Sequence, residues 1–177
     1  MEANLIKFDF NKLDRFDIVI HLASLASPVY YKKYPLETID IGTTVTRKLL
    51  EKCKEWDARF IFFSSSEIYG NPSSEYIPTP ENFKGYVSCQ GPRSCYDESK
   101  RLGETLCYIY NNKFNVNTKI IRPFNIYGPI QSNRAVIPTI ISQILSGKKE
   151  IKLGSIYPTR DFNFVEDTCN AFKAVAS

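Results

Sequence analysis

The sequence of 177 residues contains a single histidine, His21, and this scarcity excludes several kinds of site. A serine- or cysteine-based catalytic triad is possible only if His21 is its base, and we expect His21 to be a structural residue at a strand end. The five cysteines form no Cys-x-x-Cys pair, so we predict no zinc site. Their odd number and wide spacing are typical of free thiols, and we expect a cytoplasmic protein.

Glycine is also scarce, and the spacing of the eight glycines is informative. No two of them lie two or three residues apart, so the sequence contains neither G-x-G-x-x-G nor a Walker A loop. A standard loop for the diphosphate of a dinucleotide is therefore absent from these 177 residues.

Long apolar runs and a strong charge of one sign are absent as well. No apolar run approaches the roughly 20 residues of a membrane-spanning helix, and charges at Glu2, Lys7 and Asp9 argue against a signal peptide. A net charge of +4, spread over the whole chain, is too small to predict nucleic-acid binding. We therefore expect a globular protein with neither membrane nor nucleic acid as partner.

Strands that alternate with helices predict an α/β fold with a mostly parallel sheet. Apolar runs typical of strands buried on both faces are found at residues 16–23, 58–64 and 116–122. Two weaker short strands are expected at residues 4–10 and 150–153. The expected helices are residues 35–54, 94–114, 137–145 and 166–176. Several prolines predict a loop between the second strand and the second helix, at residues 65–92.

Polar residues follow each of the three buried strands. Ser24 follows the first strand, the cluster Ser64–Glu67 follows the second, and Asn125 follows the third. The carboxyl ends of parallel strands meet at one edge of a sheet, and ligands bind there. The sequence therefore predicts a site at this edge.

Tyr96 and Lys100 lie four residues apart and share one face of the second long helix. A nearby ammonium group can lower the pKa of a phenol, and the phenolate can take a proton from a sugar or alcohol hydroxyl. The alternative interpretation is an amphipathic helix in which the tyrosine packs and the lysine is solvated. Ser65 and Glu67, about 30 residues earlier, add a hydroxyl and a carboxylate, although serine is also common in turns.

In combination these motifs resemble those of the extended short-chain dehydrogenase/reductases that modify nucleotide sugars, the NAD-dependent epimerase/dehydratase family. Segments similar to UDP-glucuronate decarboxylases are His21–Pro28, Ser65–Gly70 and Gly91–Glu104. Segments more similar to nucleotide-sugar 4,6-dehydratases are Arg122–Pro129, Asn133–Pro138 and Pro158–Phe162. The resemblance runs from about Asn4 to the end of the sequence, and it does not distinguish between the reactions.

The resemblance implies a partial Rossmann-like, doubly wound parallel sheet followed by the start of a small C-terminal substrate domain. Residues 1–130 would form an incomplete NAD-binding domain with the catalytic residues, and residues 131–177 part of the substrate-binding region. The first strand, glycine-rich turn, first helix and second strand of the family are missing from these residues.

The resemblance also implies catalytic roles for four residues. Tyr96 would take the proton of the sugar C4 hydroxyl, and Lys100 would lower its pKa and hold the nicotinamide ribose. Ser65 matches the catalytic Ser/Thr of the family. Glu67 matches the carboxylate that takes the C5 proton in the dehydratases.

Further residues are implied to bind the cofactor or the substrate. Those expected to line NAD are Ala23, Ser24 and Pro123, together with Tyr96 and Lys100. Those expected to bind the nucleotide sugar are Asn125, Arg134 and Arg160. Arg160 would pair with a diphosphate oxygen, for which its planar fork is suited. The alternative for both arginines is a solvated surface position.

Two residues depart from the family pattern. Ser66 stands where many 4,6-dehydratases carry an aspartate, and the pair Ser66-Glu67 is found in decarboxylases and in GDP-mannose-type dehydratases. Ile39 stands where the family usually has an asparagine.

The implied function is NAD-dependent modification of a nucleotide sugar through a C4 ketone, as in UDP-glucuronate decarboxylase. The alternatives are a 4,6-dehydratase or an epimerase and, from another class, a non-catalytic fragment that binds a nucleotide sugar or a paralogous subunit. The family often dimerises through the helices expected at residues 35–54 and 94–114, which implies a homodimer.

Overall fold

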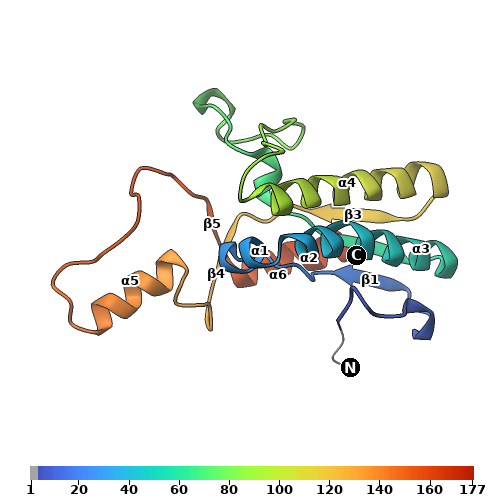
Figure 1. Cartoon of the computed structure of the whole chain (residues 1–177), viewed down its shortest axis with the longest axis horizontal. Helices are drawn as coiled ribbons and strands as arrows, with labels where there is room; N and C mark the ends of the chain where they lie inside the picture. The colour runs from blue at the N-terminus through green and yellow to red at the C-terminus, as the bar shows by residue number, and fades with distance from the viewer. Residues whose placement is uncertain (1–3) are drawn as a thin grey trace. The chain divides into compact units, whose positions relative to one another are not determined.

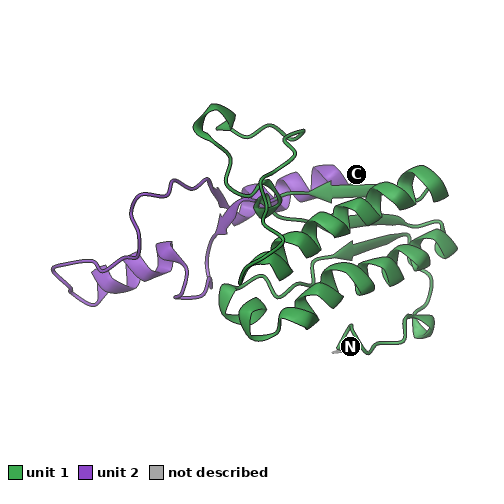
Figure 2. Ribbon diagram, turned by 45° about the horizontal axis from the view of Figure 1, so that its top comes forward, with its two compact units in different colours: residues 1–122, 176 green, residues 123–175, 177 purple. Residues whose placement is uncertain are grey.

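The computed structural model describes residues 4–177, which form two compact units. Unit 1 extends to Arg122 and includes Ala176, and unit 2 comprises residues 123–175 and Ser177 (Figure 2). Ser65, Glu67, Tyr96 and Lys100 all belong to unit 1, so this unit contains the expected catalytic residues.

The described part of unit 1 contains a parallel sheet of three strands in the order β1-β2-β3. The strands are β1 (Ile18–His21), β2 (Arg59–Phe63) and β3 (Thr118–Ile121). Ile20 pairs with Ile61, and Phe62 pairs with Ile120. Because parallel strands need a long crossover connection, each pair of neighbours is joined through helices (Figure 1). The α/β class and the parallel sheet predicted from the alternating pattern are confirmed.

The two long helices predicted for unit 1 are present, and the structure adds a short helix, α1, that was not predicted. The connection from β1 to β2 contains α1 (Pro28–Lys33), α2 (Pro35–Asp40), the π-helix η2 (Ile41–Val45) and α3 (Thr46–Trp56). The expected helix at residues 35–54 is therefore a continuous helical path with a π-helical insertion. The connection from β2 to β3 contains α4 (Ser94–Phe114), which has the predicted bounds. The expected loop at residues 65–92 contains only the short 3-10 helices η3 (Ser66–Tyr69) and η4 (Ser74–Tyr76) among its helical segments.

The core of unit 1 lies where α3 and α4 pack on each other and on the sheet. Its fully or nearly fully buried members include Leu50, Cys53, Phe60, Phe62 and Cys107. Gly103 allows the close approach of α4 to β2, because a Cβ atom there would lie 2.3 Å from Cζ of Phe62. This contact sets the distance between α4, which carries Tyr96 and Lys100, and the sheet.

The strand expected at residues 4–10 is wrong. The backbone forms a turn at residues 5–7 and the 3-10 helix η1 (Phe10–Lys12), which Asp9 caps by accepting a hydrogen bond from the backbone N–H of Asn11. The apolar side chains of this segment pack on the core, and its backbone does not add a strand to the sheet. Phe10 is only 6% exposed within that core.

The expectation that β1 and β3 are buried on both faces is also wrong. Ile18 and Ile20 are each 44% exposed, and Lys119 and Ile120 are exposed on β3. Ile18 and Ile20 are two positions apart, so they share one face of β1, and this face is exposed while Val19 and His21 on the opposite face are more buried. Among residues 4–177, both strands also lie at the edges of the sheet. Only β2, the central strand, has the burial that a continuous apolar run predicts.

Unit 2 contains a parallel pair, β4 (Asn125–Tyr127) and β5 (Phe162–Phe164), and the helices α5 (Val136–Leu145) and α6 (Val165–Ala176). Both helices begin one residue before their predicted starts. The strand expected at residues 150–153 does not form, since the side chain of Gln143 takes the backbone hydrogen bonds of Lys152 at 2.8 and 2.9 Å. The two observed strands of three residues each are too short to be recognised from sequence. No helix within residues 4–177 has the length and hydrophobicity needed to cross a membrane.

Candidate active site

The carboxyl edge of the three-stranded sheet gathers polar residues from separate segments of unit 1. His21 at the end of β1 is in register with Phe62 on β2, so the residues that follow these strands emerge at the same edge. Ala23 and Ser24 follow β1 and are partly buried, whereas Ser64 and Ser65 follow β2 and are buried.

Ser65 and Tyr96 are brought together at this edge. Ser65 has an extended backbone and caps η3, where its Oγ accepts a hydrogen bond from the backbone N–H of Glu67 at 3.2 Å. Tyr96 stands in the first turn of α4 and is 7% exposed. The Ser65 side chain lies close enough to the Tyr96 phenol to lower its pKa, although 31 positions separate the two residues in the sequence. The structure thus joins the hydroxyl and the phenol that the sequence motifs singled out.

The electrostatics of Tyr96 differ from the sequence expectation. Burial raises the pKa of its phenol, and the nearby Ser65 side chain only partly opposes this effect. Glu67 and Asp97 raise the pKa of Tyr96 further, because negative charge disfavours a phenolate. The expected lowering by Lys100 is therefore outweighed in this structure.

Lys100 is almost fully buried, and it binds to the sheet. Its Nζ donates a hydrogen bond to the carbonyl of Phe63 at 2.6 Å and lies 5.8 Å from the centre of the Tyr96 ring. Burial lowers the pKa of Lys100 to about 8, because the charged ammonium is poorly solvated. The lysine therefore lies on the same face of α4 as the tyrosine, as the spacing predicts, but its ammonium points to the end of β2.

Glu67 forms an ion pair with Arg93 at the beginning of α4, a residue that was not predicted to belong to the site. The Arg93 guanidinium lies 2.5 Å from the carboxylate of Glu67 and 3.6 Å from that of Asp97. Burial raises the pKa of Asp97, and the charge of Arg93 opposes this. Oδ1 of Asp97 is buried without a hydrogen-bond partner among residues 4–177. The spacing of Arg93 and Asp97, one helical turn apart at the start of α4, was the available signal for this cluster.

Tyr31 on α1 completes the surroundings of Tyr96. The two rings are stacked with their centres 5.4 Å apart, and Tyr31 is only 2% exposed. No sequence signal pointed to this contact, because Tyr31 and Tyr96 belong to separate helices that only the tertiary structure brings together.

His21 has the structural position that we expected. Its imidazole is 3% exposed and donates from Nε2 to the carbonyl of Ile41 at 3.2 Å. Ile41 opens the π-helix η2, and such insertions leave main-chain carbonyls available for other partners. Burial lowers the pKa of His21 from 6.5 to about 4, so the ring is neutral near neutral pH.

The remaining expected binding residues lie in unit 2 and are described within that unit. Asn125 opens β4, and its side-chain amide donates to the carbonyl of Asp161 at 3.2 Å. Arg160 directly precedes Asp161, so the structure brings Asn125 and the segment of Arg160 together. Arg134 is exposed in the turn before α5, and Pro123 is the first residue of the unit.

A parallel sheet with serine, tyrosine and lysine at its carboxyl edge is the arrangement of the short-chain dehydrogenase/reductase fold. The sequence model of the NAD dependent epimerase/dehydratase family matches residues 4–177, and the chain belongs to this family.

The relatives are proteins that act on nucleotide sugars. The chain is 38% identical over 161 residues to UDP-glucuronic acid decarboxylase 1 of Xenopus tropicalis, covering 90% of this chain and 38% of the relative. It is similar in structure to UDP-N-acetylglucosamine 4-epimerase from Methanobrevibacter ruminantium M1, with a TM-score of 0.84, 30% identity, and coverage of 99% of this chain and 56% of the other.

A third relative was solved with both cofactor and substrate. This relative is UDP-glucuronic acid 4-epimerase from Bacillus cereus in complex with UDP-glucuronic acid and NAD. The similarity has a TM-score of 0.77 and 30% identity, and it covers 99% of this chain and 54% of the epimerase. The chain therefore spans about half, or less, of the length of these relatives.

Proposed function

We propose that this chain carries the catalytic residues of an NAD-dependent enzyme that modifies a nucleotide sugar through a C4 ketone, with a UDP-linked uronic acid as substrate. The observation that supports it most is the contact of Ser65 with Tyr96 beside Lys100, at the carboxyl edge of the sheet. The 38% identity to a UDP-glucuronic acid decarboxylase supports the substrate class.

The residues present fit the nicotinamide end of NAD. Lys100 presents a buried ammonium next to Tyr96, and the partly buried Ala23 and Ser24 lie at the same edge. These residues would hold the nicotinamide and its ribose, and a role of Pro123 in binding NAD is part of the same proposal. When bound, NAD accepts the hydride from C4 of the sugar. The diphosphate end has no glycine-rich loop within these 177 residues.

In the proposed reaction, Tyr96 takes the proton of the C4 hydroxyl, and Ser65 donates a hydrogen bond that stabilises the phenolate. Because burial raises the pKa of Tyr96, the phenolate needs positive charge nearby. Lys100, whose Nζ lies 5.8 Å from the centre of the Tyr96 ring, would supply that charge and would also hold the ribose of the nicotinamide. The resulting C4 ketone is β to the C6 carboxylate, so the sugar loses carbon dioxide without a base at C5. C5 then takes up a proton and the hydride returns to C4, which leaves the cofactor unchanged overall.

Dehydratase or epimerase chemistry is the second candidate. The side chain of Glu67 is 43% exposed, so it could take the C5 proton that dehydration requires. Its ion pair with Arg93 would first have to open, and this favours decarboxylation. The third candidate is a non-catalytic protein that binds a nucleotide sugar or a paralogous subunit.

A homodimer through α2, α3 and α4 is part of the proposal. Apolar side chains are exposed along two of these helices, namely Leu36 and Ile39 on α2 and Leu102, Tyr108 and Ile109 on α4. We also propose a cytoplasmic location, in line with the free thiols, and a substrate-binding role for Asn125, Arg134 and Arg160. The division into an NAD-binding part up to residue 130 and a substrate-binding part after it belongs to the same proposal.

The test uses the protein in its full natural length, supplied separately with UDP-glucuronic acid and with a nucleotide hexose in the presence of NAD. We expect release of carbon dioxide from the acid. A 4-keto-6-deoxy sugar from the hexose, with no carbon dioxide from the acid, would establish the dehydratase instead. Interconversion of the C4 epimers would establish the epimerase. Binding of UDP-glucuronic acid without turnover of either substrate would favour the non-catalytic protein.

A further inference from the structure

Glu104 extends the catalytic face of α4 by one turn. Tyr96, Lys100 and Glu104 follow one another at intervals of four residues, so they lie along one stripe of the helix. The Glu104 side chain is 13% exposed, and it accepts a hydrogen bond from Oγ of Ser64 at 2.5 Å. Because Ser64 directly precedes Ser65, this bond attaches the chain next to the expected catalytic serine to the helix that carries Tyr96.

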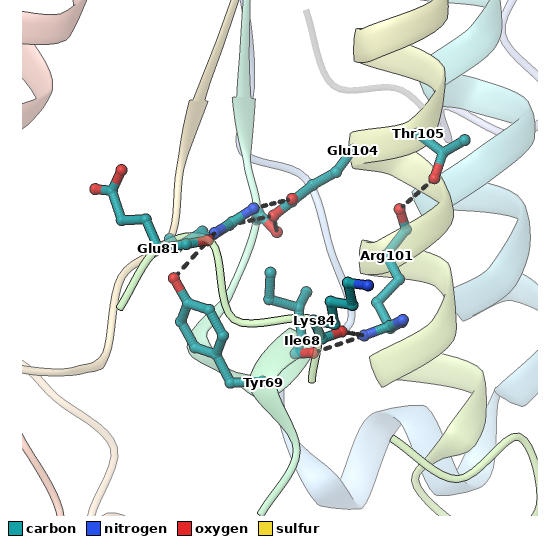
Figure 3. A network of polar contacts seen from close by, with 9 residues as sticks. Ile68, Tyr69, Glu81, Lys84, Arg101, Glu104 and Thr105 are labelled. Atoms are coloured by element: carbon teal, nitrogen blue, oxygen red, sulfur yellow. Dashed lines mark hydrogen bonds and ion pairs between the residues drawn. The ribbon is translucent and has the colours of Figure 1, made fainter. Parts of the chain in front are cut away.

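Arg122, which directly follows β3, holds Glu104 in place. Its guanidinium makes two parallel contacts with the carboxylate, at 2.9 Å from Nε to Oε1 and 2.6 Å from its second terminal nitrogen to Oε2. The third nitrogen donates to the hydroxyl of Tyr69 at 3.0 Å and to the carbonyl of Glu81 at 2.7 Å (Figure 3). One arginine therefore connects the end of β3, the helix α4 and the loop that follows β2.

The segment with Ser65 and Glu67 is consequently fastened on both sides. Ser64, which precedes the segment, is hydrogen-bonded to Glu104, and Tyr69, which follows it, is hydrogen-bonded to Arg122. Arg101 on α4 adds hydrogen bonds to the carbonyls of Ile68 at 3.0 Å and Lys84 at 2.9 Å (Figure 3).

We infer that Arg122 and Glu104 are positioning residues, which hold Ser65 and Glu67 against Tyr96 without contacting the substrate themselves. This inference rests on the proposed function. Ser65 and Tyr96 come from different elements, so their side chains stay close only if the loop after β2 is fixed to α4. Catalysis by oriented groups is sensitive to displacements of about 1 Å. A bidentate arginine–carboxylate pair restricts such displacements, and a lysine does not reproduce its fork.

The experiment compares Arg122→Lys and Glu104→Gln with Glu51→Gln in the full-length protein. Glu51 is a matched control, because it lies on α3 and accepts a hydrogen bond from Tyr110 on the same helix α4. Arg122→Lys keeps the positive charge and loses the fork. Glu104→Gln keeps an acceptor for Ser64 and loses the carboxylate.

We expect both site variants to lower kcat by about 10- to 100-fold with KM changed by less than about threefold, because orientation is lost and binding is kept. The control should keep the parental kcat. A variant is used to judge the inference only if its melting temperature lies within about 5 °C of that of the parent protein. If Arg122→Lys fails to fold, Glu104→Gln is judged by the same criteria. Parental kcat in the folded variants, or equal losses in variants and control, would overturn the inference.

Hydrogen exchange of the backbone amides of residues 64–69 gives a second readout that does not depend on turnover. We expect faster exchange there in Arg122→Lys and Glu104→Gln than in the parent or in Glu51→Gln. If the parent turns over neither substrate, the proposed function fails, and the exchange result alone decides whether the pair holds the segment. Unchanged exchange would then contradict the inference.

Discussion

Replacing Gly103 by alanine tests the packing that places α4 on the sheet. The added Cβ would lie 2.3 Å from Cζ and 2.8 Å from Cε1 of Phe62, and 3.1 Å from the carbonyl oxygen of Gly42. Carbon atoms prefer separations of about 3.5–4.0 Å, so α4 or the ring has to move by about 1 Å. The ring has little freedom, since Phe62 is 1% exposed and lies between Phe60, His21 and Lys100.

Two opposing effects set the magnitude of the change. Overpacking of a core typically costs about 1–3 kcal/mol, and the rigid surroundings of Phe62 place Gly103→Ala at about 3 kcal/mol. Alanine in a helix interior is favoured over glycine by about 1 kcal/mol. The net loss of unfolding free energy is therefore about 2 kcal/mol, which is roughly a 30-fold change in the folding equilibrium constant.

Chemical denaturation of the full-length protein, followed by circular dichroism, measures this loss. Gly154→Ala is the control, because nothing lies within 4 Å of a Cβ atom at that position. We also expect a lower kcat in Gly103→Ala, since the displaced helix carries Tyr96 and Lys100. A Gly103→Ala protein that is as stable as the parent, or more stable, would refute the close approach of α4 to Phe62.

Four further predictions follow from the site and the surface. Tyr96→Phe keeps the packing and removes the proton acceptor, so turnover should fall by more than about tenfold, and a smaller loss would contradict the assigned base. His21 binds a proton more readily in the unfolded chain, since its pKa is lowered to about 4 in the fold, so stability should decrease by up to about 3 kcal/mol as the pH falls from about 6.5 to about 4. In His21→Asn, the denaturation midpoint should depend less on pH between about 6.5 and about 4 than in the parent protein. The isolated chain of 177 residues should show no micromolar NAD affinity in calorimetric titration, because it lacks the glycine-rich loop. Charged substitutions at Leu36 and Tyr108 should shift the full-length protein from dimer to monomer in sedimentation velocity, whereas a persistent dimer would exclude this interface.

The two long helical segments of unit 1 could be predicted because their determinants are local, whereas the short α1 was missed. The bounds of α4 follow from a run of helix-forming residues after Pro92, and the loop at residues 65–92 follows from its prolines. The shared face of Tyr96 and Lys100 is a consequence of helix geometry alone. The expected meeting of the residues after β1 and β2 needed only the rule that parallel strands end at one edge.

Burial and pairing between distant segments could not be predicted in this way. An apolar run signals a strand, but only the tertiary structure makes β2 the central strand of the described sheet and leaves the face of β1 that carries Ile18 and Ile20 exposed. The pKa of Tyr96 likewise depends on how deeply α4 is buried and on which carboxylates lie nearby, so its rise outweighs the lowering that the spacing of Lys100 suggests.

The sequence by itself determined the longer helices, the loop and the Tyr96–Lys100 face, because each depends on residues within a few turns of one another. Only the tertiary structure decided that Arg93 pairs with Glu67 and that Arg122 pairs with Glu104. These ion pairs join segments that are 26 and 18 positions apart, and an arginine in a sequence gives no indication of which carboxylate it will reach. The partner is selected when α4 packs on the sheet, since that packing brings each arginine within reach of one particular carboxylate.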